Sequence, residues 1–292
     1  MTTILSAFRS AAAAKPTDPL LVYFDGVLSY GEVDRISDAF GVALADSGFR
    51  RGDRIALYLQ NLPQYVLALI SAWKLGGVVV AVNPMLTPRE VSKLLTDSTP
   101  TVLVTLDELH SAELAEVVDR SSVSSVITSS ALDFQAAGDD RILPAVRAAI
   151  PKGAHDFAEL VRQYDDRVPA ETTVEADDVA VITYTSGTTG APKGAMNTHR
   201  NVATGGYAYR DWFALSDRDV VLGIAPLFHV TGLTGHIACT IAAGASLVLS
   251  YRFNVDVVLD MIRRHRPTFT VGAITVFIAL GEAPGVDSVD LS

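Results

Sequence analysis

Short apolar runs rich in β-branched residues alternate with longer stretches of helical periodicity along most of the chain. The runs predicted as strands are residues 54–58, 78–81, 101–104, 179–183, 220–222, 246–249 and 268–271. The stretches predicted as helices are residues 64–74, 88–97, about 200–213, a segment after 232, 255–264 and 274–280. Such alternation is typical of mostly parallel sheets covered by helices on both faces. The pattern therefore predicts an α/β fold.

The pattern changes in two places. Near the start, residues 22–24 and 27–29 flank Asp25 and Gly26, a two-residue hairpin signal, and Ser29 with Glu32 forms a capping box that opens a helix. Between about residues 121 and 175 the periodicity weakens among serines and prolines, which indicates a boundary near 168–178. We predict two subdomains: residues 1–175 with the N-terminal hairpin, and residues 176–292.

Composition limits the class of protein. A hydrophobic content of 49% over 292 residues allows a large core, and the net charge of -10 argues against nucleic acid as a partner. No apolar run approaches the roughly 18 residues of a membrane span, and the N-terminus shows no secretory signal. The single Cys239 excludes an intrachain disulfide and is in keeping with a reducing, cytoplasmic location.

One segment points to chemistry. Residues 184–194 combine hydroxyl side chains with three glycines and Lys193, directly after the apolar run 179–182. Glycines let backbone N–H groups converge on an anion, while hydroxyls and a lysine add donors and charge. The segment therefore predicts a loop that holds the phosphates of a nucleoside triphosphate.

Other glycine motifs do not match this segment. Pro192 stands where a Walker loop needs its second glycine, and Gly194 stands where it needs a hydroxyl. Tyr184 occupies the place of the first glycine of a nucleophile elbow. We predict a strand, a loop and a second strand, followed by a helix capped by Asn197 or Thr198. A plain surface turn is the alternative, and the ordered Thr-Ser-Gly-Thr-Thr-Gly run argues against it.

With this loop, two further segments make the sequence similar to the AMP-forming acid–CoA ligases of the adenylate-forming superfamily. The family's phosphate loop is matched from Thr185 to Lys193, and the other two matches are residues 73–90 and 225–232. The resemblance runs from about residue 21 to the end. It implies the large N-terminal α/β domain of these enzymes, with two subdomains built of mostly parallel sheets.

The resemblance also implies a reaction. A small-molecule carboxylate attacks the α-phosphate of ATP to give an acyl-adenylate and pyrophosphate, and the thiol of coenzyme A then displaces AMP. The residues that would bind the phosphates are Thr185, Ser186, Gly187, Thr188, Thr189, Gly190 and Lys193. Lys193 would neutralise charge on the departing pyrophosphate, and the hydroxyl of Thr185 would help to hold Mg²⁺.

The third matched segment implies the acyl pocket, with Phe228, His229, Thr231 and Gly232 as its residues. His229 would control access of the carboxylate to the α-phosphate. Without the motif, a histidine on an apolar segment is more often a core residue. The other histidines form no metal-spaced cluster, and Trp73 and Trp212 are predicted to pack in the core or between helices.

Several family features lie beyond the last residue, Ser292. They are the adenine-binding strand and loop, the Tyr-Gly-x-Thr-Glu motif, the ribose-binding aspartate and the C-terminal lid with its lysine. We therefore expect a truncated ligase domain with little or no ligase activity on its own. The alternatives are a nucleotide- or acyl-binding module without catalysis, and a subunit completed by a partner chain or a homo-oligomer. A fatty acid is the first expectation for the substrate, and an aryl acid the second.

Overall fold

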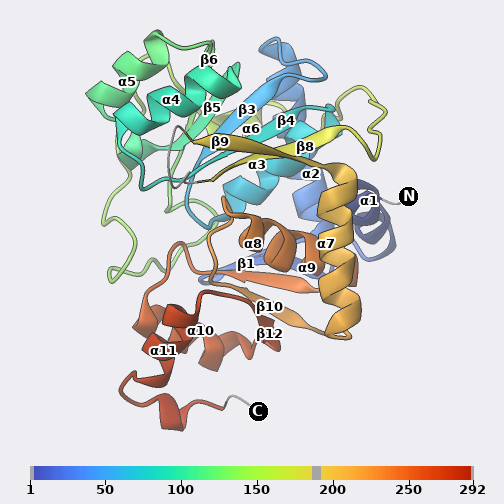
Figure 1. The fold of residues 1–292 in the computed structure, drawn as a ribbon, viewed down its shortest axis with the longest axis vertical. Helices are drawn as coiled ribbons and strands as arrows, with labels where there is room; N and C mark the ends of the chain where they lie inside the picture. The colour runs from blue at the N-terminus through green and yellow to red at the C-terminus, as the bar shows by residue number, and fades with distance from the viewer. Residues whose placement is uncertain (1–2, 186–191, 291–292) are drawn as a thin grey trace.

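The computed structural model describes residues 3–185 and 192–290 (Figure 1). The strands are β1 (Pro19–Tyr23), β2 (Gly26–Ser29), β3 (Arg54–Tyr58), β4 (Val78–Val82), β5 (Val102–Leu106), β6 (Ser125–Ser129), β7 (His155–Asp156), β8 (Val179–Thr185), β9 (Lys193–Thr198), β10 (Val220–Gly223), β11 (Ser246–Leu249) and β12 (Phe269–Thr270). The α-helices are α1 (Ile4–Ala14), α2 (Tyr30–Asp46), α3 (Pro63–Lys74), α4 (Pro88–Ser98), α5 (Ala112–Asp119), α6 (Phe157–Gln163), α7 (His199–Trp212), α8 (Val230–Gly232), α9 (Cys239–Ala243), α10 (Val255–His265) and α11 (Ile274–Gly281). A π-helix at Leu233–Ala238 joins α8 to α9.

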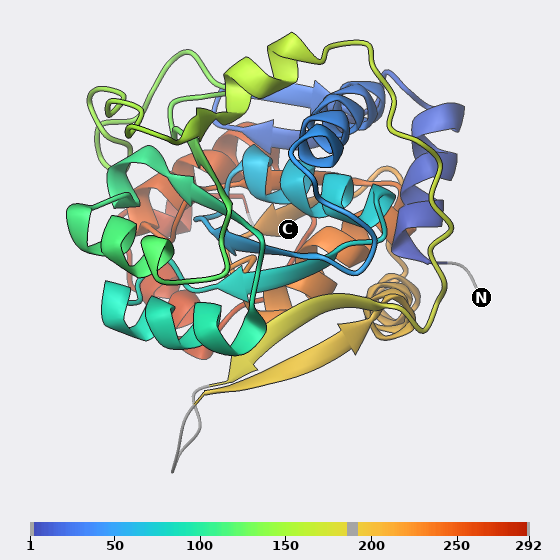
Figure 2. The same ribbon diagram turned by 90° about the horizontal axis from the view of Figure 1, so that it is seen from above.

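The larger sheet has the strand order β7-β6-β5-β3-β4-β8-β9. Its neighbouring strands are parallel except for the antiparallel pair β8 and β9 at one edge (Figure 2). Helices cover both faces because successive strand residues point to opposite sides. Ile55 and Leu57 pack in a cluster with α2 and α3, whereas Ala56 and Tyr58 pack in a second cluster with α4 and α5.

The smaller sheet has the strand order β12-β10-β11-β1-β2 and lies below the larger one in Figure 1. Its strand β1 comes from the N-terminal hairpin and pairs in parallel with β11, with Leu21 opposite Leu247. The carboxyl ends of β3 and β11 meet where Asn61 and Tyr251 exchange backbone hydrogen bonds of 2.8 and 3.0 Å. The ends of parallel strands from both sheets therefore lie at one junction, where α/β proteins commonly place their sites.

Most of the predicted elements are present, and the α/β class with mostly parallel sheets is confirmed. The hairpin is β1–β2, and the Ser29–Glu32 capping box is formed. The weak region from 121 to 175 nevertheless contains β6, β7 and α6, which the pattern did not predict. Trp73 is fully buried, but the prediction for Trp212 was wrong, because its side chain is 85% exposed at the end of α7.

The boundary near residue 175 stays a prediction, and strand pairing crosses it in both directions. Strands β8 and β9 follow the boundary in sequence but belong to the sheet of β3 to β7. Strands β1 and β2 precede it but belong to the sheet of β10 to β12. Among the described residues, no helix is long and apolar enough to cross a membrane.

Candidate active site

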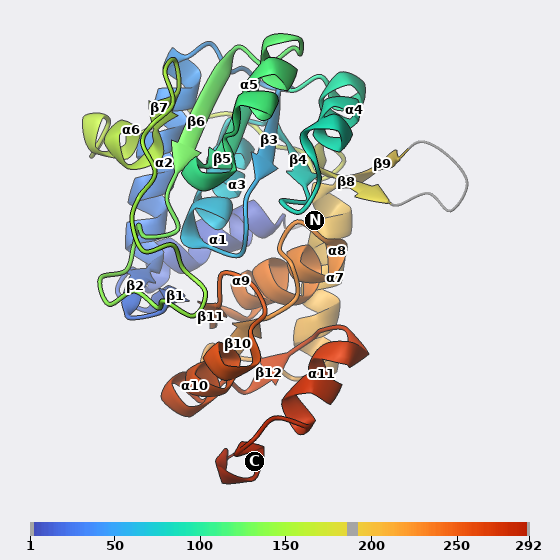
Figure 3. The ribbon, with the colours of Figure 1, turned by 90° about the vertical axis from the view of Figure 1, so that its left-hand side faces the viewer.

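The first side of the candidate site is the antiparallel pair β8–β9, which projects from the molecule in Figure 3. Thr185 ends β8 and lies opposite Lys193, the first residue of β9. The pair is held on the larger sheet by β4, and the hydroxyl of Tyr184 donates a 2.6 Å hydrogen bond to Asp97 of α4. Thr185 and Lys193 therefore flank the base of the segment 186–191.

A local close approach explains the glycine in this strand. A Cβ at Gly194 would lie 2.8 Å from the Cγ2 atom of Ile182 on β8, too close for a side chain. After β9, Thr198 caps α7 by accepting a hydrogen bond from the Asn201 N–H, and Asn201 accepts one from the Thr198 N–H in return. The two predicted strands and the capped helix are confirmed, with Thr198 as the cap, and the predicted loop 186–191 lies outside the described residues.

The second side is the segment 223–229, which leaves the carboxyl end of β10. Asn61, only 3% exposed, binds its main chain three times: the Nδ2 atom donates to the carbonyls of Gly223 (3.0 Å) and Ala225 (2.9 Å), and Oδ1 accepts from the Leu227 N–H (2.9 Å). Both N–H donors of the amide and one of the two acceptor positions on its oxygen are thus directed at this segment. The main chain before Phe228 is held from the β3 side.

The π-helix holds the same segment from the opposite direction. The Nε2 atom of His236, which is fully buried, accepts a 3.1 Å hydrogen bond from the Ala225 N–H. Burial lowers the pKa of His236 to about 4, so the ring is neutral at pH 7 and Nε2 can act as an acceptor. Gly232 is buried against Pro226 and Leu227, where a Cβ would lie 2.2 Å from the Pro226 oxygen.

The two sides face one cavity of about 460 Å³. Tyr184, Thr185 and Pro192 line it from the β8–β9 side, and Phe228, His229 and Val230 line it from the other. Helix α4 and the turn before it add further lining residues, which are Asn83, Leu86, Glu90, Lys93 and Leu94. The cavity thus combines apolar walls with a few polar groups, a composition common in small-molecule sites.

His229 is exposed in this cavity, and its hydrogen bonds define the chemistry that the ring can offer. The Nδ1 atom accepts from the Thr231 N–H at 3.2 Å and lies 3.1 Å from the Thr231 hydroxyl. A neutral ring with Nδ1 as acceptor carries its proton on Nε2. His229 can therefore donate a hydrogen bond to an oxygen of a bound anion.

Glu90 and Tyr184 both have other partners. Glu90 accepts from the N–H and the hydroxyl of Thr87 at 2.8 Å each, which lowers the pKa of its carboxyl. Burial, followed by the hydrogen bond to Asp97, raises the pKa of Tyr184 to about 12. At pH 7 the cavity therefore offers an ionised carboxylate from Glu90 and a neutral phenol from Tyr184.

The described residues do not form a Mg²⁺ site by themselves. Within residues 3–185 and 192–290 there is no group of three or more histidine, cysteine, aspartate or glutamate side chains arranged to hold a metal. Thr185 supplies one hydroxyl oxygen, and Glu90 is engaged by Thr87. Mg²⁺ prefers carboxylates together with substrate phosphates. The role of Thr185 as a magnesium ligand stays a prediction.

The structure places the predicted residues in three groups. Thr185, Phe228 and His229 line one cavity, and Lys193 lies opposite Thr185 in β9. Thr231 contacts His229, and Gly232 is packed below the same segment. Ser186, Gly187, Thr188, Thr189 and Gly190 lie outside the described residues. The sequence prediction missed Asn61 and His236, whose only signal was a polar residue among apolar neighbours.

Comparison with known proteins identifies the family to which the chain belongs. Residues 8–292 match the family described as AMP-binding enzyme. The long-chain-fatty-acid–CoA ligase of Bacillus subtilis (strain 168) is 31% identical over 302 residues, which cover 99% of this chain and 53% of that protein. The 4-coumarate–CoA ligase 1 of Solanum tuberosum is 28% identical over 272 residues, covering 92% of this chain and 46% of the relative. The chain therefore spans about half the length of these relatives.

Solved structures show the same fold. A benzoate CoA ligase from Burkholderia xenovorans LB400 superposes with a TM-score of 0.83 at 22% identity, covering 98% of this chain and 53% of the other. The N-terminal domain of FACL13 from Mycobacterium tuberculosis superposes with a TM-score of 0.79 at 26% identity, covering 99% of this chain and 67% of that domain. With a family match over nearly its whole length, the chain belongs to the AMP-binding enzymes.

Proposed function

We propose that the protein containing this chain activates a carboxylic acid in two steps. The acid's carboxylate oxygen attacks the α-phosphorus of ATP, the bond to the β-phosphate oxygen breaks, and acyl-adenylate and pyrophosphate form. The thiol of coenzyme A then attacks the acyl carbon and AMP departs, leaving a thioester. The observation that supports this most directly is the cavity that Thr185 shares with Phe228 and His229.

In this proposal the β8–β9 side binds the phosphates. Lys193 neutralises the charge that accumulates on pyrophosphate as it leaves, and Thr185 begins the row of hydroxyl and glycine residues from Ser186 to Gly190. Positioning and electrostatic stabilisation supply most of the catalysis of phosphoryl transfer, so a lysine at this point has a large effect. Mg²⁺, when bound with ATP, would neutralise further phosphate charge.

The second side binds the acid. The Nε2–H of His229 donates to the carboxylate oxygen, and Phe228, Val230 and Leu94 offer apolar contact to the acyl group. A fatty acid is the first choice because the fatty-acid ligase of B. subtilis is 31% identical. An aryl acid is the second choice, given the coumarate and benzoate ligases among the similar proteins. Cys239, a buried free thiol, is in keeping with a cytoplasmic location.

Calorimetric titration of the chain with MgATP tests the phosphate side. We expect saturable binding that Lys193→Ala weakens by about tenfold to a hundredfold, the value of a charge-assisted hydrogen bond. The matched control is Lys152→Ala, which removes an exposed lysine in a turn outside the candidate site and should leave binding unchanged. Absence of binding, or equal effects of the two substitutions, would contradict the proposal.

ATP–pyrophosphate exchange with palmitate, coumarate and benzoate separates the ligase from its alternatives. Exchange by the pure chain would establish the first step and identify the acid. Saturable binding without exchange would favour a module that binds nucleotide or acyl groups. Exchange that appears only after addition of a polypeptide with a Tyr-Gly-x-Thr-Glu motif would favour a subunit that needs a partner chain.

A further inference from the structure

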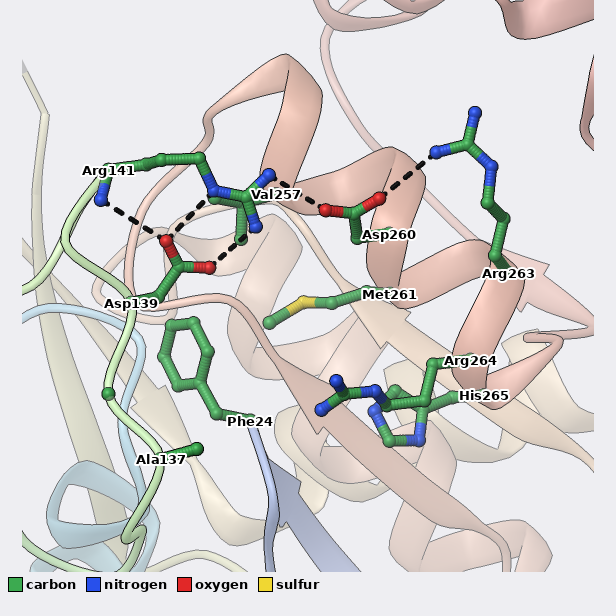
Figure 4. A pocket seen from close by; sticks show the side chains of 11 residues that line it. Phe24, Ala137, Asp139, Arg141, Val257, Asp260, Met261, Arg263, Arg264 and His265 are labelled. Atoms are coloured by element: carbon green, nitrogen blue, oxygen red, sulfur yellow. Dashed lines mark hydrogen bonds and ion pairs between the residues drawn. The ribbon is translucent and has the colours of Figure 1, made fainter.

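The structure has a second cavity, with a volume of about 360 Å³ (Figure 4). None of the residues that line it also lines the cavity of the candidate active site. Three segments line the second cavity: Phe24 after β1, the loop 137–141 and one side of α10 from Val257 to His265. Its volume is at the lower end of the range for small-molecule pockets, about 300–1,000 Å³. A ligand with one ring fits this size better than a nucleotide does.

The apolar wall of the cavity is fixed by its surroundings. Phe24 and Met261, at 6% and 4% exposure, present a ring and a thioether to it. Phe24 has a φ of 55°, a left-handed conformation that a bulky residue adopts only when its surroundings impose it. The adjacent Asp25 carboxylate accepts hydrogen bonds from the N–H groups of Ala136 and Ala137 at 3.0 Å each. The hairpin and the loop are thus tied together beside the cavity.

Along one rim of the cavity, four charged side chains are linked in a row by hydrogen bonds and ion pairs. Arg141 binds both oxygens of Asp139 at 2.9 and 2.7 Å and donates to Asp260 at 2.7 Å, and Asp260 accepts from Arg263 at 3.0 Å (Figure 4). Two cations and two anions therefore compensate one another. The network joins the loop to α10 and leaves little charge for a ligand.

Arg264 and His265 make no hydrogen bond or ion pair with these four residues, although the charge of Arg264 helps to lower the pKa of Asp139. The Arg264 guanidinium extends from α10 toward Phe24, beside the His265 ring (Figure 4), and no hydrogen bond or ion pair to it is found within residues 3–185 and 192–290. The His265 Nε2 atom is buried and also lacks a hydrogen-bond partner in that part of the chain. Burial, and then Arg264, lower the pKa of His265, so its ring is neutral at pH 7. Among the described residues that line the cavity, Arg264 is thus a cation without a hydrogen bond or ion pair, and the carboxylates of Asp25 and Asp139 interact with it only through their longer-range charge.

A role at the helix end explains only part of this arrangement. Basic residues in the last turn of α10 offset the negative end of the helix dipole, which accounts for Arg263 and Arg264 as residue types. This electrostatic role does not explain why Arg264 lines a cavity together with the apolar side chains of Phe24 and Met261. The same dipole disfavours an anion of high charge at this place. A ligand with a single negative charge is therefore favoured over a polyphosphate.

We propose that this cavity binds a small aromatic monocarboxylate, with its carboxylate on Arg264 and its ring between Phe24 and Met261. The planar guanidinium can bind both carboxylate oxygens in parallel. The aromatic and thioether walls offer a ring favourable contacts at its edge and face. This is a second binding site, separate from the cavity that would hold the acid for adenylation.

Methyl NMR of ¹³C-methionine tests the proposal because the chain has four methionines: Met1, Met85, Met196 and Met261. Met261 lines the second cavity, whereas Met85 lies between Asn83 and Leu86 of the candidate active site. The substitution Met261→Leu assigns the Met261 signal. Titration with benzoate should move this signal in a saturable way, and benzamide, which has the same ring without the charge, should not.

Arg264→Gln should weaken the benzoate effect on Met261 by about tenfold or more, as expected for loss of a charged hydrogen-bond donor. Arg218→Gln is the matched control: Arg218 is exposed in a different loop, and its substitution should leave the titration unchanged. Both side chains are exposed, so both variants should keep the wild-type melting temperature.

The outcomes separate this proposal from the proposed function. No movement of Met261, equal movement with benzamide, or equal affinity in Arg264→Gln would overturn the second site. Movement of Met85 without Met261 would place benzoate at the candidate active site alone, which also overturns it. Binding of MgATP, tested separately through Lys193, does not depend on any of these results.

Discussion

The two sides of the candidate active site are built in opposite ways. On the side formed by the segment 223–229, the main chain of residues 223–227 accepts or donates four hydrogen bonds with the buried side chains of Asn61 and His236. On the β8–β9 side, Thr185 ends β8 and Lys193 begins the edge strand β9, which has no buried residue. The segment 223–229 is held by buried side chains, whereas the β8–β9 pair is held mainly by strand pairing and by the hydrogen bond from Tyr184 to Asp97.

This difference predicts how substitutions divide between stability and function. Changes that remove the partners of the main chain near Ala225 should lower the free energy of unfolding, because buried polar groups are left unsatisfied. Changes on β9 that keep the backbone pairing should leave stability almost untouched, so that any loss of ligand binding there can be assigned to the site. Four substitutions test this contrast.

Asn61→Ala should have the largest effect. It leaves the carbonyls of Gly223 and Ala225 and the N–H of Leu227 without partners in the core. We expect a loss of roughly 3 kcal/mol or more in the free energy of unfolding, measured in urea. The neighbouring Gln60→Ala, whose amide has only a 3.8 Å contact with the Met85 sulfur, should cost less than about 1 kcal/mol. Equal losses would contradict the role given to Asn61.

Gly232→Ala should come next. The new Cβ would lie 2.2 Å from the Pro226 oxygen and 2.7 Å from the Leu227 Cα, so the backbone must move. We expect a loss of about 2–3 kcal/mol in urea unfolding. Gly281→Ala, where no atom lies within 4 Å of the added Cβ, should be neutral or stabilising by up to about 1 kcal/mol. If Gly232→Ala unfolds at the same urea concentration as the wild type, the main chain at Pro226 and Leu227 can move to make room for the added Cβ.

His236 should make stability depend on pH. Its pKa is about 4 in the folded protein and about 6.5 in the unfolded chain, so the unfolded state binds the proton between these values. The contribution is complete above pH 6.5 and is lost as the pH falls toward 4. Between pH 7 and pH 5 the loss is about 2 kcal/mol.

The variant His236→Gln keeps an acceptor for the Ala225 N–H but does not titrate. Urea unfolding at both pH values should therefore show a smaller decrease for this variant than for the wild type. His199, whose pKa burial also lowers to about 4, remains in both proteins and serves as the common background. Identical decreases would mean that His236 is not the group that titrates.

Met196→Thr should have the smallest effect. Met196 is 67% exposed on β9, and threonine suits a strand, so we expect a change within about 0.5 kcal/mol. Ile182→Thr changes the residue directly opposite on β8, where the side chain is 7% exposed, and should cost about 2 kcal/mol. A large loss for Met196→Thr would show that β9 contributes more to folding than its exposure indicates.

Much of the fold could be predicted because strands buried on both faces are continuous apolar runs. Residues 78–82 are five aliphatic residues, and all of them are buried in β4. The strand β6 was missed because it contains serine and threonine at three of five positions, and its neighbours, not its composition, determine its state. The assignment of β1 and β2 to the sheet of β10 could not be predicted, since pairing partners distant in sequence leave no local signal.

Some residues of the candidate site could also be predicted from the sequence, and others could not. Thr185, Lys193, Phe228 and His229 belong to motifs that can be recognised in the sequence. Asn61 was not recognised because an asparagine after a strand is usual in a turn, and only the structure shows that its amide is directed at residues 223–227. Supporting residues of this kind are defined by distance in space, which spacing along the chain does not reveal.

The pairing of β1 with β11 has a consequence for synthesis of the chain. The N-terminal segment is made first, yet its partners come last: Lys15 donates to the carbonyl of Gly244, at a sequence separation of 229 residues. At about 5–20 residues per second, ribosomes need roughly 10 to 45 seconds to cover this distance. During that time the apolar residues of β1 have no strand to join except β2. We therefore expect chaperones to bind the exposed apolar residues of β1 on the nascent chain until β11 has been synthesised.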